Sequence, residues 1–343
     1  MSYEFKEIYD KETWKNFEEN FHSFETFFQS WEWTEFEKSM GKEIFRIGIY
    51  GTGKNELLGV MSIVLIDAKR GRLLHVRNGP LLDWSNKDLV IETIGHLKHF
   101  ATTKNCSHVR ISPLLKESPE NRKLMKNLGL VDSQMHDVDA ETTWILDVDL
   151  EDNELLAKMR TNTRYHINRK RKETVEIETS TNPEDLKKFW PIFSNTVERQ
   201  DWKAYPYKYL YNEFKIFRES NKAMLILAKY DGQYIAGTYI IFHKGMAYCH
   251  HSASLTAYRK IASPYLVQWR AIQEMKARGI KKYNFFGIAR TDDQRHPWSG
   301  LTFFKKGFGG YIDEHLHAHD IPVKKRYWLT HYYELIQRKL KGF

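Results

Sequence analysis

The segment Phe45–Gly79, FRIGIYGTGKNELLGVMSIVLIDAKRGRLLHVRNG, contains runs of Ile, Val, Leu and other apolar residues separated by polar, glycine-containing turns. The segment Met224–Ser254, MLILAKYDGQYIAGTYIIFHKGMAYCHHSAS, repeats this pattern. Runs rich in β-branched and aromatic residues between such turns predict strands joined by tight hairpins. Each segment is therefore predicted to form an antiparallel meander, and the pair indicates an internal repeat.

A predicted helix and a further strand follow each meander. In the first half they are Lys87–Thr103 and Ser107–Ser112, and in the second half Pro264–Arg278 and Lys282–Gly287. Each half then ends in a short helical stretch, a glycine turn and a strand. Unrelated domains rarely keep the same order and spacing, so we infer two copies of one α/β unit of about 150 residues. This order of elements resembles the GNAT-type acyltransferase fold.

The predicted fold class is α/β, or α+β, with two tandem GNAT-like domains whose mixed central sheets are flanked by helices. The first domain is expected over residues 1–150, because a predicted strand, Thr143–Val148, ends just before that boundary. The second domain is expected over residues 151–321. Residues 322–343 are predicted to form a C-terminal helix that packs back on the domains.

The chain of 343 residues carries a formal net charge of +9. A basic balance favours acidic partners such as nucleic acid, anionic lipid or phosphorylated small molecules, although solubility alone also explains it. The two cysteines, Cys106 and Cys249, fit no metal or redox spacing and suit a reducing compartment. Met1–Asp10 lacks the apolar core of a signal peptide, and no apolar stretch is long enough to span a membrane. We therefore expect a soluble, cytoplasmic protein.

The stretch Lys158–Lys172, KMRTNTRYHINRKRK, contains many basic residues and no acid. Charge runs usually form a solvated face, but both signs normally mix when solubility is the only purpose. The sharper interpretation is a helix that contacts backbone phosphates. The basic residues are Lys158, Arg160, Arg164, Arg169, Lys170, Arg171 and Lys172.

An aromatic stretch, Trp202–Tyr211 (WKAYPYKYLY), follows in the second half. Pro206 can open a helix there, and on a helix these rings cannot all face the core. One interpretation is a helix that lies partly in the core and partly on the surface. The other is a wall of Tyr205, Tyr207 and Tyr209 that holds a sugar or peptide by stacking and hydroxyl hydrogen bonds.

Two groups of histidines lie in predicted strands. His250 and His251 are adjacent, so they should point to opposite faces and form no metal pair; one of them faces a pocket, or both are ordinary core or surface residues. His315, His317 and His319 alternate and should share a face, but no acid or thiol at a recognised spacing completes a metal site. Neither HExxH nor CxxC occurs, so no metal is expected.

The most distinctive segment is Asn284–Gly310, NFFGIARTDDQRHPWSGLTFFKKGFGG. A predicted strand ends at Gly287, and the polar loop after it is either a functional site or an ordinary solvated connection. The chain contains no GxSxG nucleophile elbow and no phosphate loop. The candidate residues of this loop and the helix after it are Asp292, Asp293, His296, Trp298, Phe304 and Lys305.

Seven short segments, in order along nearly the whole chain, resemble the Fem family of peptidoglycan-bridge aminoacyltransferases. Each is weak alone, but in order and ending in HPW-x-G-x-T-x-FK-x-GFGG they form a specific pattern. The segments are Gln29–Trp33 (QSWEW), Gly79–Leu82 (GPLL), Thr163–Arg171 (TRYHINRKR), Ser252–Ser254 (SAS), Pro264–Trp269 (PYLVQW), Tyr283–Gly287 (YNFFG) and His296–Gly310 (HPWSGLTFFKKGFGG).

The resemblance implies an enzyme that moves an amino acid from aminoacyl-tRNA onto the stem peptide of a nucleotide-linked or lipid-linked peptidoglycan precursor. It implies no cofactor, no metal and no DNA partner, allows peripheral contact with the inner face of the cytoplasmic membrane, and leaves the oligomeric state open. Some relatives carry a long helical hairpin in the second domain. The span Arg171–Trp190 has no room for one, so the chain resembles the compact members.

By the resemblance, Lys305 lies at the reaction centre, where we expect it to stabilise the tetrahedral oxyanion. Phe304 is its neighbour in the motif, and Tyr209 lines the acceptor site. A lysine and an arginine that bind phosphate in the family are replaced here by Glu35, with Lys38 close by, and by Tyr205.

The remaining roles stay open at this point. The attacking amine must lose a proton, and the candidate acceptors are Asp292, Asp293, His296 and His251, or the substrate itself. Candidates for substrate binding are Trp33, Lys38, Tyr205, Tyr207, Tyr209, His251, Ser254, Arg259, Trp298 and Phe304. Candidates for binding tRNA or other phosphates are Arg160, Arg164, Arg169, Lys170, Arg171 and Lys172.

Two other classes of protein compete with this interpretation. The first is an acyl-CoA-dependent GNAT enzyme, which would cradle pyrophosphate with a glycine-rich loop at a helix N-terminus. The corresponding stretches, Asn78–Lys87 and Tyr258–Pro264, show no such loop. The second is a non-catalytic protein that binds tRNA or a membrane surface, which the net charge favours but which has no need of the HPW-to-GFGG segment.

Overall fold

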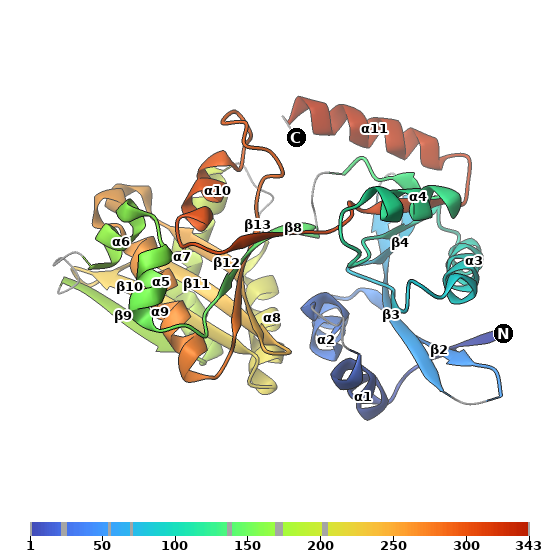
Figure 1. Cartoon of the computed structure of the whole chain (residues 1–343), viewed down its shortest axis with the longest axis horizontal. Coiled ribbons are helices and arrows are strands. Elements are labelled where there is room, and N and C mark those ends of the chain that lie inside the picture. The colour runs from blue at the N-terminus through green and yellow to red at the C-terminus, as the bar shows by residue number, and fades with distance from the viewer. Residues whose placement is uncertain are drawn as a thin grey trace. The chain divides into compact units, whose positions relative to one another are not determined.

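The chain forms two compact units in a computed structural model, and each unit is described here by itself (Figure 1). Unit 1 consists of Met1–Thr142, Arg295–Pro297 and Glu314–Phe343, and unit 2 consists of Thr143–Gln294 and Trp298–Asp313. The structure describes residues 2–21, 26–53, 56–68, 71–135, 139–168, 174–200 and 205–341.

A mixed sheet forms the centre of unit 1, with strand order β1-β2-β3-β4-β6-β15-β7 and β5 paired to β3. The predicted meander is present as β2, β3 and β4, which pair antiparallel. β4 and β6 pair parallel, because α3 (Lys87–Thr103) crosses over between them. The strands are β1 (Tyr3–Glu7), β2 (Glu43–Gly51), β3 (Leu57–Ala68), β4 (Gly71–Val76), β5 (Leu81–Leu82), β6 (His108–Ile111), β7 (Val131–Asp132) and β15 (His319–Pro322).

The helices of unit 1 other than α11 begin where the sequence offers a capping side chain. Asn86 accepts from the backbone N–H of Leu89 at the start of α3, and Ser118 caps α4 in the same way, with Pro119 at its first position. The apolar face of α3 packs into the core of the sheet. The helices are α1 (Lys11–Asn20), the 3-10 turn η1 (Phe27–Gln29), α2 (Trp31–Ser39), α3, α4 (Pro119–Asn127) and α11 (Tyr327–Leu340).

Unit 2 repeats this plan around a sheet of order β14-β8-β13-β12-β11-β10-β9. Its meander is β10, β11 and β12, and α9 (Ser263–Ala277) crosses over to β13, which pairs parallel to β12. Two mixed sheets flanked by helices confirm the predicted fold class. The strands are β8 (Thr142–Asp147), β9 (Val175–Ser180), β10 (Ala223–Tyr230), β11 (Gln233–His243), β12 (Met246–Ser254), β13 (Lys282–Gly287) and β14 (Tyr311–Glu314).

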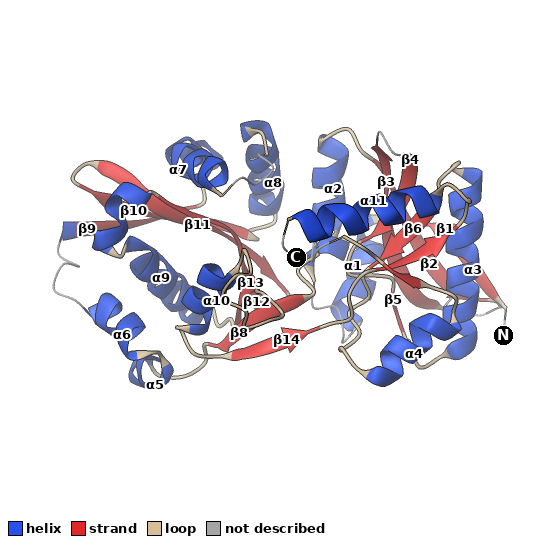
Figure 2. Ribbon diagram, turned by 90° about the horizontal axis from the view of Figure 1, so that it is seen from above, coloured by secondary structure: helices blue, strands red, loops and turns tan. Residues whose placement is uncertain are grey.

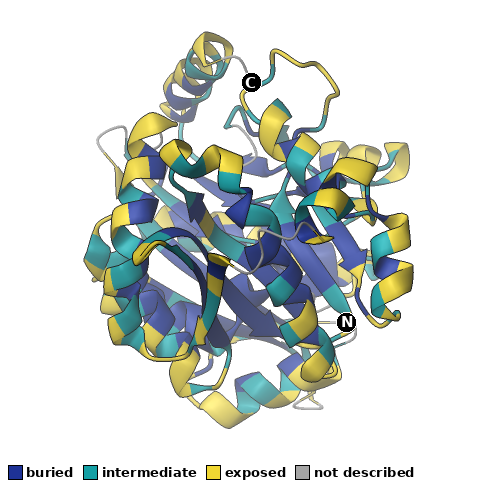
Figure 3. Cartoon of the chain, turned by 90° about the vertical axis from the view of Figure 1, so that its left-hand side faces the viewer, coloured by how far each residue is buried: buried dark blue, intermediate teal, exposed yellow. Residues whose placement is uncertain are grey.

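Helices cover both faces of the unit 2 sheet. Figure 2 shows α7 and α8 on one face and α9, with α5 and α6, on the other. The strands between these layers are buried, whereas the outer faces of the helices are exposed (Figure 3). The helices are α5 (Asp152–Lys158), α6 (Thr161–Asn168), the 3-10 turn η3 (Pro183–Asp185), α7 (Leu186–Arg199), α8 (Tyr207–Glu219), the 3-10 turn η4 (Thr256–Ile261), α9 and α10 (Ser299–Lys306).

The domains were predicted to divide at residues 150 and 321, but each unit contains a strand that was expected in the other. β8, expected to close the first domain, pairs antiparallel with β13 of unit 2. β15, expected to close the second domain, pairs with β6 and β7 of unit 1. Local hydrophobic pattern marks a strand but does not choose its partner, so the predicted boundaries missed this exchange. The C-terminal helix α11 belongs to unit 1.

The expected strand of three alternating histidines does not form. β14 ends at Glu314 and β15 begins at His319, so His315 and His317 lie between the two strands. His317 lies 3.4 Å from a carboxylate oxygen of Glu141, whereas His319 lies 3.0 Å from Asp132. The histidines therefore do not line one strand face, because no single strand runs through all three positions. Among the described residues, no helix is both long and apolar enough to cross a membrane.

Candidate active site

Lys305 is a buried cation in the short helix α10 of unit 2. Its side chain enters the protein interior, and its residue is only 7% exposed. The ammonium nitrogen donates a hydrogen bond of 2.6 Å to the carbonyl oxygen of Gly287, at the end of β13. Among the described residues no carboxylate pairs with it, and burial lowers the pKa of Lys305 to about 8. Such a cation is available to a developing negative charge.

The sequence around Lys305 holds α10 against the end of β13. The hydroxyl of Thr302, one turn before Lys305, accepts a hydrogen bond of 2.9 Å from the backbone N–H of Ala289. Thr302 and Lys305 are the buried residues of α10, and their spacing of three places them on one face. The helix is thus tied to the chain at Gly287 and again at Ala289, which fixes where the ammonium group lies.

The next side chain, Phe304, packs against aromatic rings of the same unit. Its ring lies 5.0 Å from that of Tyr265 and 5.2 Å from that of Phe308. Arg160, from the predicted basic stretch, places its guanidinium group 3.7 Å from the Phe303 ring centroid and donates to the Phe303 carbonyl oxygen. The structure therefore brings the start of the basic stretch to α10.

The rest of the basic stretch is only partly described. The guanidinium group of Arg164 donates to the carbonyl oxygens of Leu156 and Ala157, beside α6. The predicted phosphate-binding residues Arg169, Lys170, Arg171 and Lys172 lie outside the described residues.

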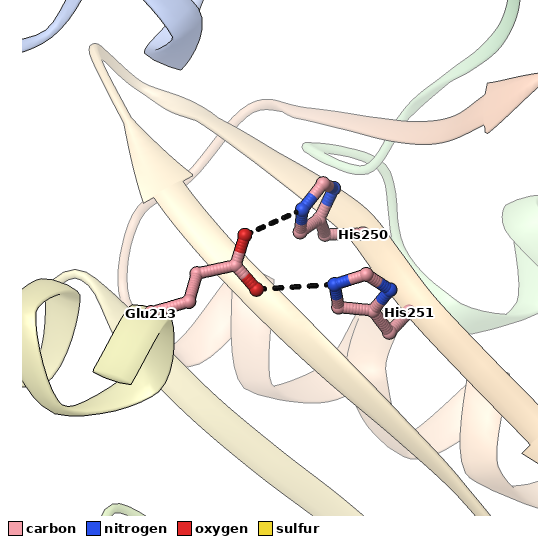
Figure 4. A group of neighbouring side chains, drawn as sticks. All are labelled: Glu213, His250 and His251. Atoms are coloured by element: carbon pink, nitrogen blue, oxygen red, sulfur yellow. Dashed lines mark hydrogen bonds and ion pairs between the residues drawn. The ribbon is translucent and has the colours of Figure 1, made fainter. Parts of the chain in front are cut away.

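β12 carries a β-bulge at its two histidines. Tyr239 on β11 pairs with His251, and the next residue, Ile240, pairs with Cys249, so His250 has no opposite residue. A bulge rotates the following side chain relative to the strand alternation. Both imidazoles therefore reach the same side of the sheet, and the expectation that they point to opposite faces was wrong (Figure 4).

Glu213 binds both of these histidines from α8. One carboxylate oxygen lies 2.9 Å from Nε2 of His250, and the other lies 3.0 Å from Nε2 of His251 (Figure 4). Glu213 is fully buried. Burial by itself would raise the pKa of this carboxyl group, but the two imidazoles hold it at about 2. The carboxylate is therefore ionised at neutral pH.

The Glu213–His250–His251 cluster was missed in the sequence, although a signal was present. The buried residues of α8 are Leu210, Glu213, Phe214 and Phe217, which follow the spacing of an apolar helix face. A glutamate in such a stripe is unusual, because carboxylates are rarely buried without partners. The sequence does not show which partners it meets, since these come from a strand more than thirty residues later.

Two of the predicted aromatic residues lie beside this cluster. Tyr205 stacks on Tyr209 with ring centroids 4.2 Å apart, and the Tyr205 ring lies 6.3 Å from that of His251. Tyr205 is 41% exposed, so this pair offers a stacking surface to a ligand. Tyr207 turns to another side of the helix, where it contacts Trp190 at 5.6 Å.

Lys305 and the Glu213–His250–His251 cluster both lie near the point where the pairing between β12 and β13 ends. Their parallel pairing ends at Tyr248 and Asn284. Beyond that point, the ring of Phe286 lies 5.4 Å from that of His250. The next residue, Gly287, is the one whose carbonyl oxygen binds Lys305. The end of these two strands therefore carries both groups of polar side chains.

The other predicted residues of unit 2 lie at or near its surface. The carboxylate of Asp292 is 93% exposed and forms an ion pair of 2.9 Å with Lys306. Asp293 and Arg259 are exposed, and Trp298 is half-buried just before α10. Ser254, at the end of β12, is held through its backbone by the hydroxyl of Thr196.

Three predicted residues belong to unit 1. Trp33 is buried in an aromatic cluster, with its ring 4.7 Å from Phe28 and 5.1 Å from Phe36. Lys38 is exposed and lies 3.6 Å from Glu35, the residue that replaces an expected lysine. His296 is half-buried, in the short stretch that groups with unit 1. Their roles in substrate binding and catalysis stay predictions.

Comparisons with known proteins agree with this architecture. The chain matches the FemAB family over residues 9–234 and 229–334. The lipid II:glycine glycyltransferase of Staphylococcus epidermidis is 21% identical, covering 90% of this chain and 93% of that protein. The enzyme of the same name from Staphylococcus aureus is 20% identical, covering 85% of this chain and 87% of that protein.

Solved structures show the same fold. A crystal structure of FemX superposes with a TM-score of 0.81 at 20% identity, covering 95% of this chain and 99% of that one. A tandem GNAT protein from the clavulanic acid pathway superposes with a TM-score of 0.58 at 11% identity, covering 94% and 99%. The fold is thus that of proteins with two tandem GNAT-like domains. The chain belongs to the FemAB family, and it is an aminoacyltransferase.

Proposed function

We propose that this enzyme transfers an amino acid from aminoacyl-tRNA onto the stem peptide of lipid-linked peptidoglycan precursor. The observation that carries the proposal is the buried ammonium group of Lys305, which has a carbonyl oxygen but no described carboxylate as its partner. The names of the relatives support the acceptor, since both are lipid II:glycine glycyltransferases.

The chemistry is aminolysis of an activated ester. A primary amine of the stem peptide attacks the ester carbonyl carbon, the C–N bond forms, and the C–O bond to the tRNA ribose breaks. The proton lost by the amine leaves with the ribose oxygen. Lys305 stabilises the oxyanion of the tetrahedral intermediate, and a single preorganised donor of this kind contributes about 3 kcal/mol. Holding the two substrates together supplies several more.

The surrounding residues divide between the two substrates in this proposal. Arg160 and Arg164 bind phosphates of the tRNA acceptor end in this proposal, which is supported by the contact of Arg160 with α10 and by the place of Arg164 on α6, one turn further along the chain. Tyr205 and Tyr209 form a stacking surface for the sugar or peptide of the acceptor. The candidate proton acceptors are Asp292, Asp293, His296 and His251, and the imidazole of His251 is held by the buried carboxylate of Glu213.

The C-terminal helix α11 gives this enzyme a surface for the membrane that carries a lipid-linked acceptor. Tyr327, Thr330 and Glu334 are the buried residues of α11. Large apolar side chains are exposed elsewhere on the helix, with basic residues at both ends, as in helices that lie in a membrane interface. The exposed residues are Trp328, Leu329, Tyr332, Tyr333, Ile336 and Leu340, and the basic ones are Lys324, Lys325, Arg326, Arg338 and Lys339.

A transfer assay tests the reaction. The full chain is incubated with a pool of charged tRNAs and, in parallel, with UDP-linked muramoyl-pentapeptide or the lipid-linked precursor. Mass spectrometry should show a gain of one amino-acid residue on the lipid-linked acceptor, absent when the tRNA is uncharged. A gain on the nucleotide-linked acceptor alone would revise the acceptor. No gain on either, with the tRNA verified as charged, would reject the proposed function.

A vesicle assay tests the membrane surface separately. The double variant Leu329→Ser, Ile336→Ser should bind phosphatidylglycerol vesicles at least about tenfold more weakly than wild type, because each buried aliphatic side chain contributes about 1.5–3 kcal/mol. Its melting temperature should not change, since both residues are exposed. Equal binding by the variant and wild type would remove α11 from the membrane contact.

A further inference from the structure

We propose that Glu213, His250 and His251 form a binding site for one divalent transition-metal ion, with Zn²⁺ as the ion that best suits these donors. The site goes beyond the transfer reaction and does not depend on it. Each of the three residues offers one donor atom, and these atoms lie within 4.8 Å of one another. No other group of three His, Cys, Asp or Glu side chains converges in this way within the described residues.

The donor set favours zinc over harder cations. Two imidazole nitrogens and one carboxylate oxygen form a known three-residue zinc set, in which a fourth position stays open for water or a ligand. Mg²⁺ and Ca²⁺ prefer sites made of oxygen atoms. Zinc–ligand bonds are about 2.0–2.2 Å, so donor atoms already 2.9–3.0 Å apart need only small shifts to surround an ion.

The charge of the site also favours a cation. Glu213 is fully buried, and its described partners are the two imidazoles, with no lysine or arginine among them. A buried carboxylate needs a compensating positive charge. A bound divalent ion would provide this positive charge. Protonation of one of the two imidazoles is the alternative source of positive charge. Metal binding and imidazole protonation exclude one another, because a ligating nitrogen must be deprotonated.

Tyr239 supplies an independent indication that this cluster holds a ligand. The residue is completely buried, and its hydroxyl group has no hydrogen-bond partner among the described residues. Its ring lies 6.0 Å from that of His250 and 5.7 Å from that of His251. Buried hydroxyl groups are nearly always hydrogen-bonded. A water molecule on the fourth position of the metal would give this hydroxyl group a partner.

The β-bulge is the structural device that builds the site. In a regular strand His250 and His251 would face opposite sides of the sheet, and only one could reach Glu213. The extra residue in β12 turns both imidazoles to α8. An ion bound there would tie the third meander strand to α8, next to the strand end that anchors Lys305.

Metal analysis of the full chain tests the proposal without relying on activity. Protein dialysed against a chelator and then against Zn²⁺, with excess ion removed, should retain one equivalent by elemental analysis. Co²⁺ in its place should give the visible absorption of a four-coordinate site. The variants Glu213→Gln and His251→Gln should each weaken Zn²⁺ binding at least about tenfold, since even loss of an outer-sphere partner costs 10–100-fold.

A matched histidine provides the control. His319 also pairs with a carboxylate, that of Asp132 at 3.0 Å, but belongs to no converging group of three among the residues that the structure describes. His319→Gln should therefore leave Zn²⁺ binding unchanged. A wild-type chain that retains no stoichiometric zinc would overturn the proposal, and so would equal binding by the His251→Gln and His319→Gln variants. The wild-type measurement decides the matter even if the Glu213 variant fails to fold.

Discussion

Each unit buries a cation, Arg110 in unit 1 and Lys305 in unit 2, but the two cations have different hydrogen-bond partners. In unit 1, the guanidinium group of Arg110 lies 2.8 Å from a carboxylate oxygen of Asp320 and 2.8 Å from one of Glu334. These two carboxylates raise the pKa of Arg110 further above its ordinary value, although burial alone would lower it. In unit 2, Lys305 is as deeply buried but donates to a carbonyl oxygen, and burial lowers its pKa to about 8.

The buried carboxylates at the third meander strands differ in the same way. Asp139 of unit 1 binds His75 at 2.9 Å and the guanidinium group of Arg77 at 2.7 Å. Burial would raise the pKa of Asp139, but these two partners hold it well below the usual range. Glu213 of unit 2 has two imidazoles as partners and, within the described part of the chain, no guanidinium group.

This difference indicates a division of labour within one repeated fold. At these two sites unit 1 pairs its buried carboxylates with arginine, which stays charged at every relevant pH and therefore suits a structural role. Unit 2 leaves a lysine and a carboxylate whose partners are neutral or titratable, and such groups are typical of functional sites. Five measurements can break or sharpen this comparison.

The largest effect is expected from removing the arginine of unit 1. Arg110→Met leaves Asp320 and Glu334 buried without their cation, which should lower the free energy of unfolding by about 3–5 kcal/mol. Urea denaturation followed by fluorescence measures the change. Arg72→Met, which breaks the exposed pair with Asp67, should cost at most about 1 kcal/mol. Equal losses for both variants would contradict a structural role of the Arg110 pair.

Removing the lysine of unit 2 should give the opposite result. Lys305→Met is expected to lower the transfer rate by about 10²–10³-fold, the cost of losing one oxyanion donor. The free energy of unfolding at pH 7 should stay the same or rise, because the variant no longer buries an ammonium group. The neighbouring Lys306→Met, whose lysine forms an ion pair with exposed Asp292, is the matched control and should keep most of the activity.

Replacing the buried carboxylate by an amide should destabilise unit 1 more at Asp139 than unit 2 at Glu213. Asp139→Asn removes the negative charge that pairs with the guanidinium group of Arg77, which cannot lose its own charge, so we expect a loss of about 3 kcal/mol or more. Glu213→Gln faces an imidazole, which can change tautomer and accept, so the loss should be about 1–3 kcal/mol. Melting curves in metal-free buffer compare them. A larger loss for Glu213→Gln would reverse this ranking.

The smallest expected effect is the pH dependence set by Lys305. If its ammonium form is the active one, the transfer rate should fall about tenfold per pH unit above its pKa of about 8. Lys305→Arg, if it retains measurable activity, should lose this alkaline decrease, because arginine stays protonated. A decrease of the same shape in that variant would assign the titration to another group.

The stability of the fold should change with pH in the opposite direction. Between pH 8 and pH 10.5 the unfolded chain keeps the Lys305 proton and the folded chain has lost it. The unfolded state therefore binds more protons, and the free energy of unfolding should rise with pH over this range relative to Lys305→Met. Denaturation midpoints at these two pH values measure the difference.

Local elements could be predicted well, because their signals lie within a few residues. The predicted helix Lys87–Thr103 and strand Lys282–Gly287 agree with α3 and β13 in both of their bounds. Apolar periodicity and the capping side chain at Asn86 specify these bounds without any distant partner. The internal repeat, and with it the two GNAT-like units, followed from the order of such elements.

The candidate site could be predicted only in part. The motif around Phe304 and Lys305 marked the helix, but the burial of Lys305 and its bond to Gly287 depend on how α10 packs against β13. The bulge that turns His250 and His251 together depends on the register between β11 and β12, which strand alternation does not reveal.

The sequence by itself determined the repeated α/β plan, the basic and aromatic stretches, and the lysine of the distinctive motif. These are properties of residue type and spacing, which hydrophobic periodicity and turn chemistry express locally. Only the tertiary structure decided that β8 and β15 change units, and that Glu213 meets two histidines under α8. Both outcomes depend on pairing between residues far apart in the chain, where burial and strand register choose partners that no local pattern names.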